Sequence, residues 1–169
     1  MDDLDLAAGM FRYAESFRRA ADLLRIQDRK MLPFQQPIYF LYYHSIELYL
    51  KAFFKAQGLP DSETVNLWTD FRALKAACER RELHFDRFEC AVFGLLKNGS
   101  KEDEHKNKTT DKVLLSRYLT PGWDNLPTTE SLATISHSLA VKAHACLTDL
   151  RAPIHSSPVS PLGLDSMAA

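Results

Sequence analysis

Residues 39–54 read YFLYYHSIELYLKAFF, an aromatic-rich run that is interrupted by three ionisable side chains. His44, Glu47 and Lys51 follow one another at spacings of three and four residues, so on an α-helix they share one face. Nearly all the other positions are apolar, which is typical of a helix that is buried on most of its surface. The run therefore predicts a central core helix that carries these three side chains as a polar seam.

The same run is too charged for a transmembrane helix. Glu47, Lys51 and Lys55 fall within it or directly after it, and an ionised group at the centre of a bilayer costs roughly 3 kcal/mol on insertion scales. We therefore expect the core helix of a soluble bundle, without contact to a membrane.

Apolar residues recur every three or four positions in most of the remaining chain, which predicts an all-α protein. The expected helices cover residues 4–30, 34–57, 67–81, 86–97 and 128–152. Gly58, followed by Pro60, gives the second helix a clear stop signal. Neither an internal repeat nor an alternating strand pattern stands out, so the expected architecture is an up-and-down bundle of about five helices.

The bundle is expected to form a single domain over residues 1–152. At 169 residues with 46% apolar side chains, the chain is long enough to bury a substantial core without disulfides. Residues 98–112 are polar throughout, which predicts a surface loop. Residues 153–169 are rich in Pro, Ser and Gly, which predicts an extended or loosely ordered tail.

Composition and charge favour a cytoplasmic protein. The three cysteines are widely spaced, which indicates reduced thiols rather than a disulfide framework, and the acidic start MDDLDLAAGM is unlike a secretory signal. The formal net charge of −1 gives no overall positive field for nucleic acid. The arginines of the first helix are interleaved with Glu15 and Asp22, so we expect a solvated charged face there.

The polar seam has the spacing of a structural ion pair. Glu47 precedes Lys51 by four residues, which is the favourable order for a helical pair, and His44 lies one turn before Glu47. Because losing one partner of a buried pair leaves the other charge uncompensated, we expect the seam to fix how the second helix packs, with Glu47 at its centre.

A metal site is the sharper alternative for the seam. Its His-x-x-Glu spacing supplies two ligands of the type found in carboxylate-bridged bundles, which need matching ligands on facing helices. The last helix carries Glu130, His137 and His144 on a single stripe, which offers one further ligand pair at most. Since Lys51 next to Glu47 would oppose a cation, we expect neither a metal nor another cofactor.

Three segments together resemble the HEPN-domain superfamily of small up-and-down helical bundles. They are FLYYHSIELYLKAFFKAQG at 40–58, the aspartate-led DFRAL at 70–74, and LSRYLTPGWDNLPTTESLATISHSLA at 115–140, which contains Arg117 and Tyr118. The matching pieces fall within residues 34–145, which is most of the chain. The resemblance implies a HEPN-like fold.

Much of that superfamily consists of metal-independent ribonucleases, in which an arginine is followed by a histidine after four to six intervening residues. The histidine moves protons between the 2′-hydroxyl and the leaving oxygen, while the arginine stabilises the charge on phosphorus. None of the eleven arginines here has a histidine at that spacing. Arg80 and Arg81 before His84, and Arg151 before His155, are too close, so we expect no cleavage of RNA by that mechanism.

Arg117 and Tyr118 complete the set of candidate site residues. Arg117 adjoins an aromatic residue and follows an apolar entry. We therefore expect it to anchor the last loop against the bundle near the polar seam, with ligand binding as the alternative role.

Two functional classes follow from the resemblance. The first is a non-catalytic bundle that acts as an interaction or small-ligand and nucleotide-binding module, paired with a nucleotidyltransferase-like protein as members of this superfamily often are. The alternative is an RNA-cleaving or nucleotide-handling enzyme of toxin–antitoxin or defence type, with a degenerate site built from His44, Arg117 and acidic neighbours. The missing arginine–histidine spacing and the near-neutral charge favour the first class, and RNA or a nucleotide stays open as a ligand.

We also expect a homodimer that forms through faces of the long helices. The first two helices carry more aromatic rings than we expect one bundle of this size to bury, and such a surplus usually marks an interface. The rings are those of Phe11, Phe17, Phe34, Tyr39, Tyr42 and Tyr43.

Overall fold

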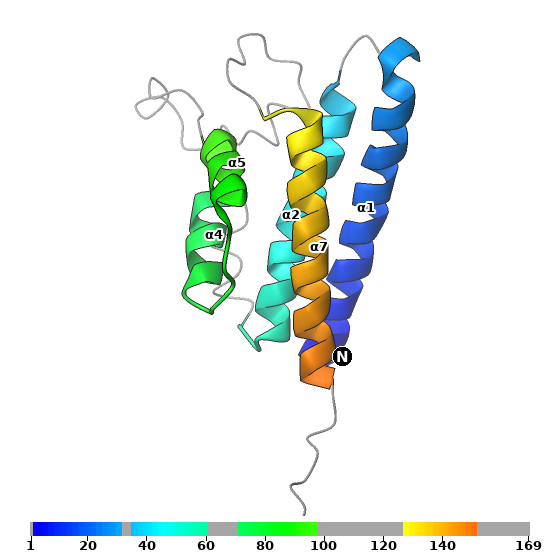
Figure 1. Cartoon of the computed structure of the whole chain (residues 1–169). Helices are drawn as coiled ribbons and strands as arrows, with labels where there is room; N and C mark the ends of the chain where they lie inside the picture. The colour runs from blue at the N-terminus through cyan, green and yellow to red at the C-terminus, as the bar shows by residue number, and fades with distance from the viewer. Residues whose placement is uncertain (1, 32–34, 61–70, 98–126, 152–169) are drawn as a thin grey trace, which may run out of the picture.

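The computed structural model describes residues 2–31, 35–60, 71–97 and 127–151, and every regular element within these ranges is an α-helix (Figure 1). The helices are α1 (Asp3–Met31), α2 (Gln36–Ala56), α4 (Phe71–Glu79), α5 (Arg87–Lys97) and α7 (Thr129–Arg151). The predicted all-α bundle is confirmed. The predictions for the polar loop at 98–112, for the tail at 153–169, and for Arg117 and Tyr118 lie outside the described residues.

Three long helices, α1, α2 and α7, lie side by side, and α1 and α2 run in opposite directions with the most extensive contact in the bundle (Figure 1). The shorter helices α4 and α5 form a pair that packs on α2 and α7, on the side away from α1. None of the helices in the described ranges combines the length and the apolar character that a bilayer crossing requires.

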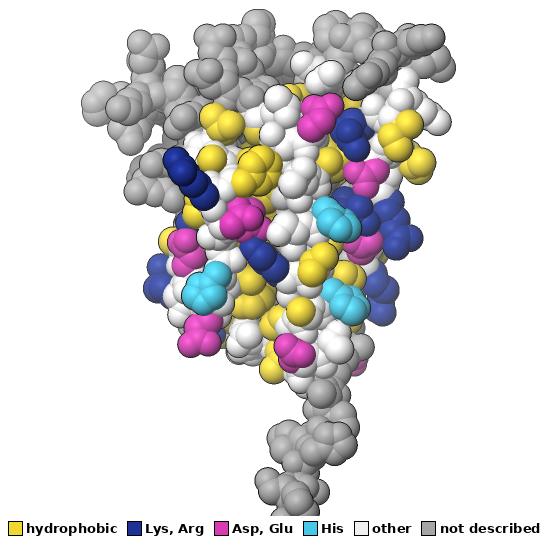
Figure 2. Space-filling model, in the orientation of Figure 1, with side chains coloured by type: hydrophobic (Ala, Val, Ile, Leu, Met, Phe, Trp, Pro, Cys, Tyr) yellow, Lys and Arg dark blue, Asp and Glu magenta, His cyan; other side chains and the backbone are white. Residues whose placement is uncertain are grey.

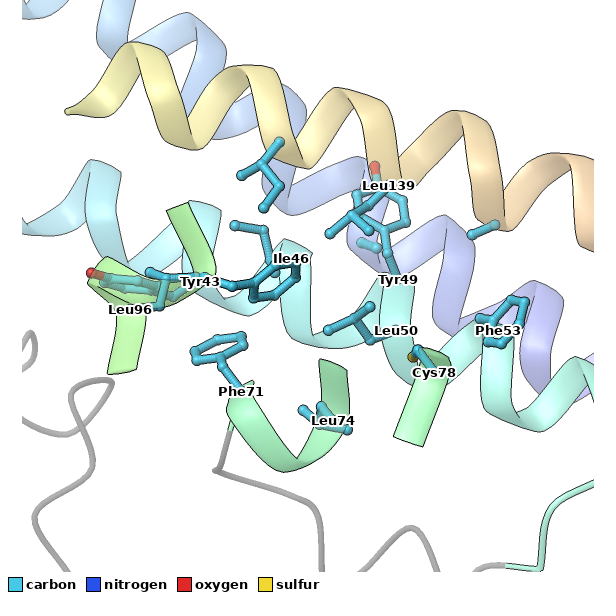
Figure 3. Close-up of a cluster of buried hydrophobic side chains, with 14 of the residues drawn as sticks. Tyr43, Ile46, Tyr49, Leu50, Phe53, Phe71, Leu74, Cys78, Leu96 and Leu139 are labelled. Carbon is cyan, nitrogen blue, oxygen red and sulfur yellow. The ribbon is translucent and has the colours of Figure 1, made fainter. Parts of the chain in front are cut away.

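Helix α2 is the central core helix that residues 39–54 predict. Its inward side chains meet those of α4, α5 and α7 in one apolar cluster (Figure 3). Burying a large aliphatic or aromatic side chain contributes roughly 1.5–3 kcal/mol, so a helix that buries most of its length organises the bundle. The members of the cluster labelled in Figure 3 are Tyr43, Ile46, Tyr49, Leu50, Phe53, Phe71, Leu74, Cys78, Leu96 and Leu139.

The aromatic surplus behind the expected homodimer is smaller than the sequence suggests. Tyr42 and Tyr43 are 0% exposed and belong to the core, while Phe11 and Tyr39 are partly buried and pack against it. The expectation is therefore wrong for Tyr42 and Tyr43, because a helix covered on several sides buries rings on more than one face. Phe34 lies outside the described residues.

The predicted stop of α2 has a clear backbone geometry. Gly58 adopts a φ of 73°, in the left-handed region that glycine enters without a steric penalty. Its N–H donates to the Lys55 carbonyl at 3.0 Å, and the N–H of Leu59 donates to the Phe54 carbonyl at 3.3 Å. This is the Schellman arrangement, with Leu59 turned back onto the core.

A buried hydrogen bond marks the close approach of α2 and α7. The hydroxyls of Ser45 and Ser136 are both fully buried and share a hydrogen bond of 2.7 Å, and Ser45 Oγ also donates to the Tyr42 carbonyl at 2.8 Å. Small side chains at this crossing let the two backbones come near each other, while the hydrogen bond avoids leaving a polar group unpaired in the core.

Candidate functional site

The structure brings His44, Glu47 and Lys51 together on one face of α2. The Lys51 ammonium donates a hydrogen bond to Glu47 Oε1, and His44 Nδ1 lies 3.6 Å from Glu47 Oε2. The Glu47 and Lys51 side chains are only 13% and 8% exposed, whereas that of His44 is 30% exposed. Glu47 is therefore the shared partner, and the two charged groups are largely withdrawn from water.

The pKa of Glu47 reports the balance of forces within the polar seam. Burial alone would raise the pKa of this carboxyl, but the contacts with His44 and Lys51 outweigh burial and hold the pKa below its usual value. A carboxylate whose pKa is lowered by folding stabilises the native state above its unfolded pKa and loses that contribution as the pH falls through the folded pKa. The seam thus stabilises the bundle at neutral pH.

His44 is held mainly by aromatic packing. The edge of the Phe17 ring from α1 meets it at a centroid distance of 4.5 Å, and the Phe40 ring lies parallel to it at 5.9 Å. Its Nδ1 atom is buried and has no partner within hydrogen-bond distance in the described part of the chain. The ring therefore joins α1 to α2 more by shape than by hydrogen bonding.

A second polar network, which the sequence does not reveal, joins α1 to α2. Glu15 accepts hydrogen bonds from Arg18 at 3.0 and 3.1 Å, from Arg19 at 3.2 Å and from the Tyr49 hydroxyl. The hydrogen bond from Arg18, opposed by burial and aided by Tyr49, lowers the pKa of Glu15 to about 2. Tyr42 donates to Asp22 at 2.6 Å in the same way. The charged face expected on α1 is therefore solvated only in part, because Glu15 and Arg18 are 18% and 16% exposed whereas Arg19 is 73% exposed.

An ion pair with a buried carboxylate joins α5 to α7. Glu89 is 1% exposed and accepts from Lys142 Nζ at 2.7 and 2.6 Å and from the Ser138 hydroxyl at 2.6 Å. It also exchanges hydrogen bonds of 2.7 Å with Asp86 at the start of α5, where each backbone N–H donates to the other side chain. The Asp-x-x-Glu spacing before an apolar stripe is the signal that could have predicted this reciprocal cap.

An open groove, which we call the α1–α7 groove, runs between the first and last helices. Its charged and titratable lining consists of Arg12, Glu15, Arg18 and Arg19 from α1 and of His137 and His144 from α7. Figure 2 shows arginine and histidine side chains gathered on the face where α1 and α7 meet. The groove is open to solvent, and its lining shares no residue with the polar seam.

The stripe that the sequence assigns to the last helix is divided in the structure. His137 and His144 line the α1–α7 groove, whereas Glu130 lies at the start of α7, where it accepts from the Thr129 hydroxyl at 3.3 Å. The structure therefore brings the two histidines to the arginines of α1 and not to the polar seam. Within the described ranges, no three His, Cys, Asp or Glu side chains gather closely enough to hold a metal ion.

Comparison with known proteins leaves the function to be argued from this geometry. Neither a protein-family model, nor a curated protein, nor a solved structure matches the chain.

Proposed function

We propose that this chain is a HEPN-like helical bundle that acts by binding a small ligand or a protein partner, without catalysis. The observation that carries the proposal is the state of the polar seam. Glu47, largely buried, already accepts from Lys51 and lies against His44, so the seam stabilises the bundle and offers no free acid–base pair to a substrate.

The contacts of His44 also argue against catalysis at the seam. The His44 ring contacts Phe17 and Phe40, and its Nδ1 atom lies 3.6 Å from the Glu47 carboxylate. Hydrolysis of a phosphodiester needs a cationic group near the histidine to stabilise the charge on phosphorus. Lys51, the cation of the seam, is hydrogen-bonded to Glu47, which neutralises it.

The proposal predicts that the purified protein does not cleave RNA. Incubation of the full chain with a structured RNA should leave the RNA intact in an assay resolved by gel electrophoresis. Steady degradation by the wild-type protein that is abolished by His44→Ala or Arg117→Ala would instead support the enzymatic alternative, an RNA-cleaving protein of toxin–antitoxin or defence type. His137→Ala serves as a parallel variant, because loss of cleavage there would locate the activity in the α1–α7 groove.

The proposed partners include a second copy of the chain and a nucleotidyltransferase-like protein. With Tyr42 and Tyr43 in the core, the support for a homodimer comes from α1, where Leu23 and Ile26 are 63% and 71% exposed and lie one turn apart. Adjacent exposed apolar side chains of this size favour an interface.

A homodimer through α1 predicts a mass near twice 19.3 kDa in light scattering at micromolar concentration. The double variant Leu23→Glu/Ile26→Glu should shift the protein to the monomer. Each copy would then bring two carboxylates to the contact, and these would repel those of the other copy. Leu150→Glu is the matched control, because Leu150 is a 45% exposed leucine on α7. A wild-type protein that scatters only as a 19.3 kDa species would refute the dimer.

A further inference from the structure

We propose that the α1–α7 groove binds a small phosphate monoester that carries an apolar substituent. The inference rests on the proposed function in its small-ligand form, and it names the binding site and the class of ligand. It begins from charge, because three arginines line the groove together with a single carboxylate, that of Glu15. The whole chain has a formal net charge of −1, so this positive excess is local.

The Glu15 carboxylate of the groove already accepts hydrogen bonds from neighbouring side chains. Glu15 accepts from Arg18, Arg19 and Tyr49, and its pKa, lowered to about 2 chiefly by Arg18, keeps it ionised at any physiological pH. Arg18 is also bonded to Asp22 at 2.8 Å and is only 16% exposed. Glu15 and Arg18 therefore form the fixed wall of the groove and not its ligand-binding groups.

Two guanidinium groups are left to face a ligand. Arg19 is 73% exposed and donates from Nε to Glu15 at 3.2 Å, and no described carboxylate pairs with its terminal N–H groups. Arg12 is exposed and forms no ion pair with any carboxylate in the described part of the chain. A guanidinium presents parallel N–H donors that match the oxygens of a phosphate.

The opposite wall supplies imidazole donors and an apolar surface. His137 and His144 lie seven residues apart on α7, which places both on the same face of the helix, and both are exposed. An imidazole ring offers at least one N–H donor in either protonation state. The rings of His144 and Phe11 lie 5.8 Å apart, and Val141, 58% exposed, lies between the two histidines in sequence.

These features fit a phosphate monoester better than a carboxylate. A phosphate monoester has three terminal oxygens and a charge near −2 at neutral pH, so it can engage two arginines and a histidine together, whereas a carboxylate has two oxygens and one charge. Phe11 and Val141 offer contact to an apolar substituent. The groove has a volume of about 780 Å³, which lies within the range of small-molecule sites.

Phenyl phosphate is a suitable probe, since it combines the two features. We expect saturable shifts of backbone amide signals of α1 and α7 in NMR titrations of the full chain with phenyl phosphate at low salt. Inorganic phosphate should bind more weakly, because it lacks the ring, and benzyl alcohol should produce no saturable shift. Arg12→Gln and Arg19→Gln should each weaken phenyl phosphate binding by about tenfold, as the loss of a charge-assisted hydrogen bond implies.

Arg81→Gln is the matched control, because Arg81 is an exposed arginine on the turn after α4, away from the groove. It should leave the affinity unchanged. The proposal is overturned if phenyl phosphate gives no saturable shifts, if Arg81→Gln weakens binding as much as the groove variants do, or if a single-stranded RNA oligonucleotide shifts the groove signals while phenyl phosphate does not. RNA cleavage by the wild-type protein would contradict the proposed non-catalytic function and leave this binding test unaffected.

Discussion

Replacing Glu89 by alanine should lower the free energy of unfolding by about 3 kcal/mol, the lower end of the range for removing one partner of a buried ion pair, because the Lys142 side chain is 27% exposed. Glu89 is 1% exposed and is the common acceptor for Lys142, for Ser138 and for the backbone N–H of Asp86. Its loss leaves Lys142 hydrogen-bonded to the His84 carbonyl, removes half of the cap of α5 and takes away the ion pair between α5 and α7. Urea unfolding followed by far-UV circular dichroism measures the effect.

Glu79→Ala is the matched control for this experiment. Glu79 pairs with Lys75 on the same helix, but it is 43% exposed, so the ion pair is solvated. Its removal should change the free energy of unfolding by no more than about 0.5 kcal/mol. A Glu89→Ala protein as stable as the Glu79→Ala protein would show that the contact between α5 and α7 does not depend on this pair.

Glu47→Ala should also lower the free energy of unfolding by about 3–5 kcal/mol, because it removes the carboxylate that pairs with the largely buried Lys51 ammonium. Lys51→Met should cost less, since methionine retains most of the apolar stem that packs against the helix. The urea midpoints of the two variants measure the difference. A seam that served a ligand would show the opposite behaviour, because the loss of functional groups is often neutral or stabilising.

The cost of Glu47→Ala should depend on pH. Contacts with His44 and Lys51 hold the pKa of Glu47 below its usual value against the effect of burial, so its contribution is present above the unfolded pKa of a glutamate, about 4.3. The contribution is lost as the pH falls through the lower pKa of the folded state. The difference in midpoint between the wild type and Glu47→Ala should therefore be largest near neutral pH and shrink in acid.

Local rules predicted the helices well. Apolar periodicity placed the second helix at residues 34–57, and the structure has Gln36–Ala56; for the last helix the expected 128–152 became Thr129–Arg151. Gly58 ended α2 because its φ of 73° is costly for other residues. The spacing of His44, Glu47 and Lys51 was enough to place them on one face, because this depends only on the geometry of a single helix.

The same local rules do not predict contacts between segments that are distant in the sequence. Glu15 and Tyr49 are 34 residues apart, and Glu89 and Lys142 are 53 apart, so their pairing depends on which helix faces meet. The periodicity of α1 predicts which of its residues are apolar and buried, but it does not predict which helix lies beside its charged residues. The α1–α7 groove was missed for that reason, although His137 and His144 were recognised as one stripe. The buried state of Tyr42 and Tyr43 likewise follows from packing on several sides of α2.

The urea midpoint of the double variant Glu47→Ala/Lys51→Met tests most directly whether the polar seam is a structural pair. If it is, the second substitution removes the ammonium that has lost its Glu47 carboxylate, and the double variant should unfold at a higher urea concentration than Glu47→Ala alone. A double variant whose loss of stability equals the sum of the two single losses would contradict this, since the two side chains would then be independent of each other.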